Sequence, residues 1–265
     1  MIAHPDTLAP GGSVGAVSAA LSRRALVAIT RVPSAFVPSV VFPVFVTIAF
    51  SGAFGAITNL PFFPTDDALS WFAPLAAIQG AGFAGLFSAF GVIRDFEDGF
   101  MDRLLLAPTP RKALLAGPLL TAALRSVVPV FAALLVGVIG GMAVPGGFLG
   151  IVSLFVAALG VAVLAACWSL GLAFRIRSMR AAPLMQVGLF FAIFLSSSQM
   201  PIEGLAGWLE TVARINPFTY ILDMGRQGFV GEVALDTTLK GLGAIAATGP
   251  VLGLFAWRGL AKLDD

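Results

Sequence analysis

The sequence predicts an all-α polytopic membrane protein with six transmembrane helices. Of its 265 residues, 58% are hydrophobic and only 11% are charged, whereas soluble domains average about 25% charged residues. Long stretches contain no charged residue, among them residues 32–65, 68–93 and 181–202. Because roughly 18 or more apolar residues suffice to cross a bilayer as a helix, most of the chain is expected to lie in the membrane.

The N-terminal residues 1–33 are expected to form a cytoplasmic tail followed by an interfacial helix. Residues 1–12 contain His4, the only histidine, and read as a tail. Residues 13–29 combine small apolar residues with Arg23 and Arg24, which suits a helix whose basic face meets lipid headgroups. A helix docked on the rest of the protein is the alternative. No cleavable signal peptide is expected, because the first apolar run follows Arg23, Arg24 and Arg31 and exceeds about 7–15 residues.

Residues 34–265 form the predicted permease domain. Its six spans are residues 34–56, 71–93, 113–139, 148–174, 181–199 and 242–257. Pro38 and Pro43 fall inside the first span, where neighbouring groups can satisfy the freed carbonyl groups. Arg125 falls inside the third, and we expect it either to extend toward the headgroups or to bridge to an acid or a lipid phosphate.

The distribution of Lys and Arg predicts the orientation of the chain in the plasma membrane. With six spans, both termini lie on the same side as the connecting residues 94–112 and 175–180, and this side carries most of the basic residues. The opposite side has only three: Arg214, Arg226 and Lys240. Because cytoplasmic loops are enriched in Lys and Arg, both termini are expected to be cytoplasmic.

The charged segment 94–112 reads RDFEDGFMDRLLLAPTPRK and predicts a short amphipathic helix. Acids precede the apolar positions, bases follow them, and Pro108 and Pro110 end the helix. Gly99 would let the chain turn sharply into it. The helix could lie on lipid headgroups. Its carboxylates suit an anionic leaflet poorly, so a protein partner is favoured.

This segment resembles the cytoplasmic coupling segment of type-2 ATP-binding-cassette exporter permeases. The family pattern of acids, a glycine, a further acid, leucines and a proline is matched by Glu97, Asp98, Gly99, Asp102, Leu104, Leu105 and Pro108. A second stretch is similar to the one that precedes the last span in that family, and it contains Asn216, Pro217, Tyr220 and Arg226. Within the family, the chain is most similar to permeases of daunorubicin-type drug exporters.

The resemblance implies a permease that works with separate cytoplasmic ATP-binding subunits. Residues 97–108 would be the coupling helix, with Asp102 facing a base on the ATPase, and the outer segment 200–240 would dip back into the membrane. A second permease chain, identical or related, would complete the path. No G-x-x-x-x-G-K-[ST] sequence occurs, so ATP and Mg²⁺ are expected on the partner and no enzyme activity here. One departure is Pro118 directly after Gly117, where the family often has a basic residue.

Polar residues inside the spans either bridge neighbouring helices, which is their usual role, or line a substrate path through the permease. Residues 196–199 read SSSQ at the end of the fifth span, and polar atoms in hydrocarbon must be satisfied. Aromatic residues precede this group, which suits an amphiphilic molecule, drug or lipid. The candidate path residues are Gln79, Gln186, Phe190, Phe194, Ser197 and Gln199.

Other functions were weighed against amphiphile export. An exporter of a glycolipid or polysaccharide precursor would use a similar scaffold. An ion-coupled carrier needs ionisable groups near mid-membrane, and only Arg125 is available. An intramembrane Ser–His protease needs a histidine within the membrane, whereas His4 is in the tail. The single cysteine, Cys167, lies in an apolar run, so no disulfide within the chain and no metal site is expected. No nucleic-acid partner is expected either.

Overall fold

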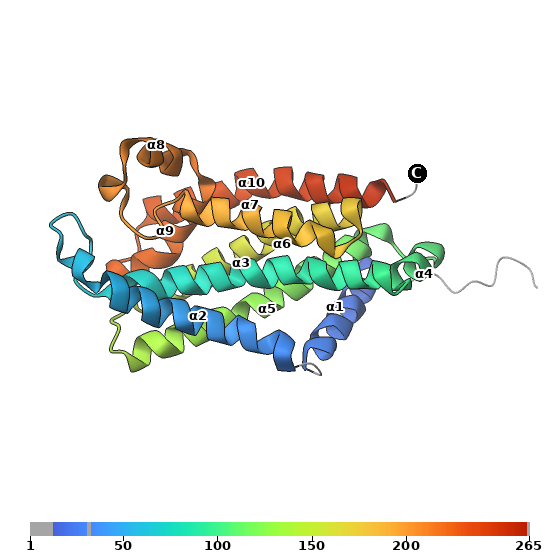
Figure 1. The fold of residues 1–265 in the computed structure, drawn as a ribbon, viewed down its shortest axis with the longest axis horizontal. Helices are drawn as coiled ribbons and strands as arrows, with labels where there is room; N and C mark the ends of the chain where they lie inside the picture. Colours follow the sequence, from blue (N-terminus) through green and yellow to red (C-terminus); the bar gives the residue numbers. More distant parts are fainter. Residues whose placement is uncertain (1–12, 31–32, 264–265) are drawn as a thin grey trace, which may run out of the picture.

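Nearly parallel helices form an elongated bundle in the computed structural model, which describes residues 13–30 and 33–263 (Figure 1). The helices are α1 (Val14–Thr30), α2 (Pro33–Phe54), α3 (Ala68–Glu97), α4 (Phe100–Leu106), α5 (Arg111–Ile139), α6 (Gly147–Ile176), α7 (Ala182–Phe194), α8 (Gly207–Ile215), α9 (Pro217–Val230) and α10 (Leu235–Ala261), with the short 3₁₀ helices η2 (Gly55–Asn59), η3 (Met179–Ala181) and η4 (Ile202–Gly204) between them. The described ranges contain no β-strand, which confirms the all-α expectation. The predicted tail, His4 and Arg31 lie outside these ranges.

Five segments are long and apolar enough to cross a membrane: Val40–Asn59, Ala68–Glu97, Arg111–Ile139, Gly147–Ile176 and Leu235–Ala261. They correspond to five of the six predicted spans, so a multi-pass membrane protein is confirmed. The remaining predicted span, residues 181–199, ends earlier in the structure than expected. Helix α7 stops at Phe194, and a turn follows it. Its 13 residues extend about 20 Å, less than the roughly 30 Å hydrocarbon core.

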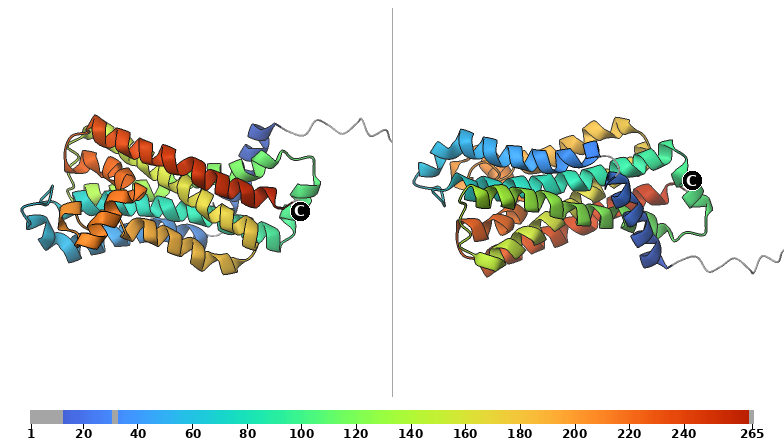
Figure 2. Two further views of the ribbon diagram at one scale, coloured as in Figure 1. Left: turned by 90° about the horizontal axis from the view of Figure 1, so that it is seen from above. Right: turned by 90° about the horizontal axis from the view of Figure 1, so that it is seen from below.

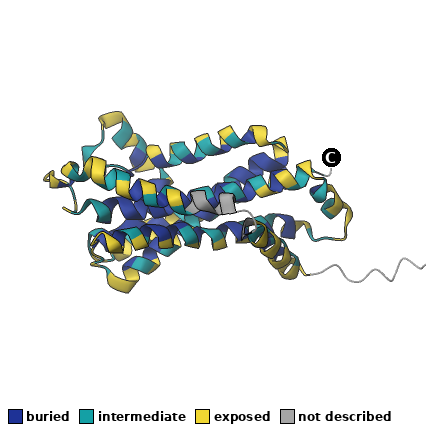
Figure 3. Cartoon of the chain, turned by 60° about the horizontal axis from the view of Figure 1, so that its bottom comes forward, coloured by how far each residue is buried: buried dark blue, intermediate teal, exposed yellow. Residues whose placement is uncertain are grey.

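Helix α3 is the centre of the bundle. It packs against α2, α5, α6 and α9, and its buried residues include Phe72, Ile78 and Leu86. Figure 3 shows this buried interior beneath outer helix faces that alternate between exposed and intermediate. Many of the exposed side chains are large and apolar, among them Phe45 and Phe131, as expected where lipid rather than water surrounds the helices.

The two ends of the bundle differ in their charged residues. Helix α1, α4 and the C-terminal end of α10 lie at one end, together with η3, and most of the Lys and Arg residues lie in or beside them (Figures 1 and 2). The loop 55–67, α8, α9 and the turn 140–146 lie at the other end, where acids predominate. We call these the basic end and the acidic end. This grouping agrees with the loop arrangement expected from the sequence.

Helix α1 docks on protein along one face, as the alternative interpretation of this segment proposed. The side chain of Leu21 faces Gly117 of α5, where even a Cβ atom would come within 2.9 Å of it. The Thr121 hydroxyl donates a hydrogen bond to the Ser22 hydroxyl at 3.2 Å. Arg23 remains exposed. The Gly117–Pro118 departure therefore falls where α1 crosses α5, and α5 continues through Pro118.

Candidate functional site

The basic end presents a short helix at a sharp corner of the chain. Gly99 joins α3 to α4 with φ 65°, in the left-handed region that favours glycine. The structure corrects one prediction here, because Glu97 is the last residue of α3 and Asp98 is its C-cap. The helix that the resemblance implied for residues 97–108 thus begins at Phe100 rather than Glu97, and Asp102 is the acid in its first turn. The chain leaves α4 through Pro108 toward α5.

One side of α4 packs against the bundle and the other is exposed. Met101 is 2% exposed, and Leu104 and Leu105 pack partly buried against the core. Asp102 is exposed. Leu106 is 89% exposed, the largest fraction among the large hydrophobic residues described. Leu106 directly follows the two leucines of the motif but is not part of the family pattern. The Leu106 side chain is therefore open to a contact from outside this chain.

An ion pair braces this corner. The Arg24 guanidinium of α1 donates two hydrogen bonds to the Asp95 carboxylate of α3, at 2.6 and 3.1 Å. Its carbon also lies 3.8 Å from the ring centroid of Phe100, the first residue of α4. The hydrogen bond to Asp95 raises the pKa of Arg24, so the guanidinium stays protonated at neutral pH. Helix α1 therefore holds the α3–α4 corner from outside.

The acidic end contains a fully buried arginine at its centre. Arg226 of α9 is 2% exposed, and its guanidinium carbon lies 3.6 Å from the ring centroid of Trp71. It donates hydrogen bonds to the carbonyl oxygens of Ser197 and Ser198, at 3.1 and 3.0 Å. The Asp223 carboxylate lies 3.9 Å away and accepts a hydrogen bond from the Ser197 hydroxyl. Arg226 thus stabilises the turn that follows α7.

Asn216 completes this clamp from the start of α9. Its side-chain amide donates to the carbonyl oxygens of Ala192 and Leu195, at 2.8 and 2.7 Å, and its oxygen accepts from the Phe218 amide. Pro217 occupies the first turn of α9. Carbonyl groups left free at the end of α7 are therefore bonded by side chains from the segment 216–226. We call Asn216, Asp223 and Arg226 the α9 clamp.

A second polar network ties α9 to α6 and α10. The Gln227 amide donates to the hydroxyls of Ser153 and Thr238, at 3.1 and 2.9 Å, and accepts from the Ala234 amide. Tyr220, selected from the sequence, donates its hydroxyl to the Arg214 carbonyl at the end of α8. Gln227 was missed because the motif ends one residue before it. Both contacts support the position of α9.

A cavity of about 280 Å³ with both apolar and polar lining residues lies beside the clamp. Its lining includes Trp71, Ser197, Glu203, Asp223 and Arg226. Ser197 thus lines a cavity from a turn rather than from a helix. Consecutive serines 196–198 are all buried here because their turn is enclosed by α9.

An aromatic seam runs along α3 between α2 and α7. Its rings are Phe42, Phe83, Phe87, Phe90, Phe190 and Phe194, with successive centroids 5.1 to 6.1 Å apart. Figure 1 shows α3 lying between α7 and α2 on this face. Most of these rings are only partly buried. The seam brings together two predicted path residues, Phe190 and Phe194, with phenylalanines that the sequence analysis had not selected.

The other predicted path residues are not joined into this arrangement. Gln79 is buried within α3, Gln186 is half-buried on α7, and Gln199 is half-buried in the turn after it. No described hydrogen bond links them to Ser197.

Arg125 lies with its guanidinium carbon 6.0 Å from the ring centroid of Phe87, so it contacts the seam. Within residues 13–30 and 33–263, no group of three metal-ligating side chains occurs.

Comparisons with known proteins agree with this architecture. A family model described as ABC-2 type transporter matches residues 18–230. The chain is 26% identical over 217 residues to the daunorubicin resistance ABC transporter permease protein DrrB1 of Streptomyces coeruleorubidus, covering 80% of this chain and 75% of the relative. It is also 26% identical over 211 residues to "Putative transport permease ycf38" of Cyanophora paradoxa, covering 77% of this chain and 70% of that protein.

Proposed function

Because the chain belongs to the ABC-2 type transporter family, we propose that it is the permease subunit of an ATP-driven exporter. It moves an amphiphilic molecule, drug-like or lipid-like, out of the cell. Separate ATP-binding subunits in the cytoplasm bind ATP and Mg²⁺ and supply the energy. The name of the Streptomyces relative, a daunorubicin resistance permease, supports a drug-like substrate.

The exposed tip of α4 is the observation that carries this proposal. Leu106 projects from the basic end at 89% exposure, and Asp102 is exposed one turn earlier. An apolar residue beside a carboxylate suits a groove on an ATPase that carries a basic residue. Gly99 sets the angle of α4. Arg24 of α1 pairs with Asp95 of α3 and stacks on Phe100 of α4, so it links the three helices. A push on α4 is therefore delivered to α3, the central helix.

The substrate path follows the aromatic seam, between this permease and a second copy or a related chain. Phe83, Phe190 and Phe194 offer ring faces to the apolar body of an amphiphile. Near the acidic end, the cavity lined by Ser197 and Asp223 offers polar groups to its other end. A path of this kind suits a molecule that is apolar along its length and polar at one end.

The six-span topology and the re-entrant segment belong to the same proposal. Helix α7 crosses as the shorter span, and the turn after it completes the crossing. Non-helical backbone at membrane depth requires internal hydrogen bonds, and the α9 clamp provides them through Asn216 and Arg226. The segment 207–230 then dips inward to Pro217 and returns. Pro217 lies deep, because it lines the same cavity as Val161 in the middle of α6. Gly228 lies back at the acidic end, because its carbonyl accepts a hydrogen bond from the amide of Gly146, just before α6.

Two substitutions that change the charge of α4 test its coupling to the ATPase. Asp102→Lys and Leu106→Asp are expected to weaken co-purification of the ATP-binding subunit, or to uncouple its hydrolysis from transport. Asp66→Lys makes the same charge change in the exposed loop at the acidic end and serves as the matched control. Normal assembly and transport in both α4 variants would show that α4 is not the transmission element.

Cysteine labelling tests the orientation. In a Cys167→Ala background, a cysteine replacing Glu210 is expected to react with an impermeant reagent from outside intact cells. A cysteine replacing Arg180 is expected to react only after the cells are opened. The reverse pattern would place both termini outside and overturn the topology.

A further inference from the structure

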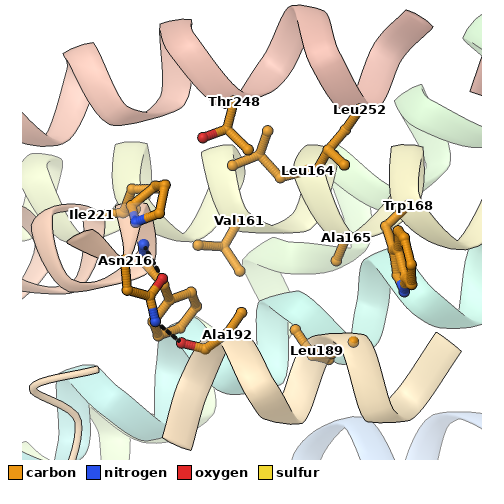
Figure 4. Close-up of a pocket in the computed structure, with 13 residues that line it drawn as sticks. Val161, Leu164, Ala165, Trp168, Leu189, Ala192, Asn216, Ile221, Thr248 and Leu252 are labelled. Carbon is orange, nitrogen blue, oxygen red and sulfur yellow. Dashed lines mark hydrogen bonds between the residues drawn. The ribbon is translucent and has the colours of Figure 1, made fainter. Parts of the chain in front are cut away.

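An apolar cavity of about 270 Å³ lies among α6, α7, α9 and α10 (Figure 4). Val161 and Leu164 of α6 line one wall, Ala192 of α7 a second, and Thr248 and Leu252 of α10 a third. Its lining includes no charged residue. A dry engineered cavity of about 150 Å³ with a similar lining binds benzene. A larger cavity of this chemistry is expected to hold an apolar ligand.

The cavity is closed toward both ends of the bundle. Trp168 closes it toward the basic end, where its indole N–H donates to the Met185 carbonyl at 3.3 Å and its ring stacks on Phe255. Asn216 and Phe218 close it toward the acidic end. The remaining side lies between α7 and α10, which do not pack along each other in the described chain, although α10 packs against α6 and α9. An apolar ligand would therefore enter through the gap between α7 and α10.

That open side faces the hydrocarbon of the bilayer. Residues 161–168 occupy the middle of the 30-residue helix α6, far from either end of the bundle. At this depth the surrounding solvent consists of lipid chains rather than water. A lipid chain is thus the apolar group available at high concentration beside the opening between α7 and α10.

The cavity is also separate from the aromatic seam. Leu189 and Ala192 line the cavity, whereas Phe190 and Phe194 belong to the seam. At 100° per residue, these two pairs lie on opposite faces of α7. We propose that the cavity binds the hydrocarbon chain of a membrane lipid, which packs behind α7 on the side away from the substrate path. This inference does not depend on the substrate or on the ATPase.

Quenching by lipids with brominated chains tests this site, because Trp168 lines the cavity. The full chain is reconstituted in vesicles that contain phosphatidylcholine brominated at mid-chain. Subtracting the emission of Trp168→Phe, which retains an aromatic stack on Phe255, isolates the Trp168 signal. We expect strong quenching of Trp168. Ala192→Phe, which fills the cavity, should remove most of that quenching.

Two further variants make the result specific. Thr248→Phe fills the cavity from α10 and should give the same loss, which guards against misfolding of a single variant. Val251→Phe adds the same ring at an α10 position that is 66% exposed, and it should leave the quenching unchanged. Absence of quenching in the native chain would overturn the proposal. So would quenching that persists in both filled variants, because the lipid would then reach Trp168 without occupying the cavity.

Discussion

Replacing Arg226 by methionine should detach the end of α7 from α9. Methionine keeps the length of the side chain, but it leaves the carbonyl groups of Ser197 and Ser198 without their donors and removes the stack on Trp71. Buried carbonyl groups without a partner are costly. Because the turn is enclosed, the cost should appear as local opening of residues 195–199 as well as lower global stability.

The size of the effect follows from these contacts. Hydrogen bonds between membrane helices average about 0.6 kcal/mol and reach about 1.7, so two of them contribute about 1–3 kcal/mol. A desolvated cation–π contact adds about 2 kcal/mol. The N–H at Nε of Arg226 has no described partner, and its desolvation offsets part of this gain. We expect Arg226→Met to lower the free energy of unfolding by about 2–4 kcal/mol.

Unfolding midpoints of the purified protein, with hydrogen exchange at residues 195–199, measure this change. Arg226→Lys keeps the charge but lacks the planar fork that reaches two carbonyl groups, so it should recover only part of the loss. Arg214→Met removes an exposed arginine paired with Glu210 and should leave the midpoint and exchange unchanged. Equal midpoints for Arg226→Met and Arg214→Met would refute the reasoning, and full recovery by lysine would refute the role of the fork.

Three further predictions concern the corner between α3 and α4, the close contact between α6 and α9, and the aromatic seam. Gly99→Val should impair coupled ATP hydrolysis, because a φ of 65° strains a β-branched residue. Asparagine tolerates this conformation, so Gly99→Asn should stay near native, and equal activities of the two variants would contradict the strain argument. Gly228→Ala should reduce folded yield because its Cβ would lie 2.1 Å from Gly150, while Gly231→Ala meets open space and should express normally; equal yields would contradict this close packing. Phe190→Ala should blunt stimulation of ATP hydrolysis by amphiphiles more than basal turnover, and Phe148→Ala, at an exposed α6 position, should change neither; equal loss of both activities at Phe190 would indicate a structural role.

Spans were predictable because each is a long stretch without charge, apart from Arg125 in the third, and a charge in hydrocarbon is expensive. The boundaries of α5 and α6 agree with the predictions within two residues. The end of α7 was not predictable, since residues 195–199 continue the uncharged stretch and nothing local stops the helix. It stops where Asn216 bonds the carbonyl groups of Ala192 and Leu195. Arg226 bonds those of the turn that follows, and these partners are 21 to 29 residues away in the sequence.

The candidate site was predictable only where a motif marked it. Asn216 and Arg226 were selected by resemblance, but their common role as a clamp requires the fold to bring α7 beside α9. Leu106 was overlooked because an exposed leucine and a buried one look alike in an apolar run. The seam depends on how α2, α3 and α7 are rotated against one another, and the spacing of phenylalanines within one helix does not specify that rotation.

Reconstitution tests the central claim most directly. The permease and its co-purified ATP-binding subunit are placed in proteoliposomes, and ATP hydrolysis and substrate movement are measured with and without an amphiphile such as daunorubicin. The account predicts that the amphiphile stimulates hydrolysis and is moved across the membrane, and that Leu106→Asp abolishes both effects while the permease still inserts. Hydrolysis indifferent to every amphiphile, with a soluble sugar or an ion transported instead, would contradict it.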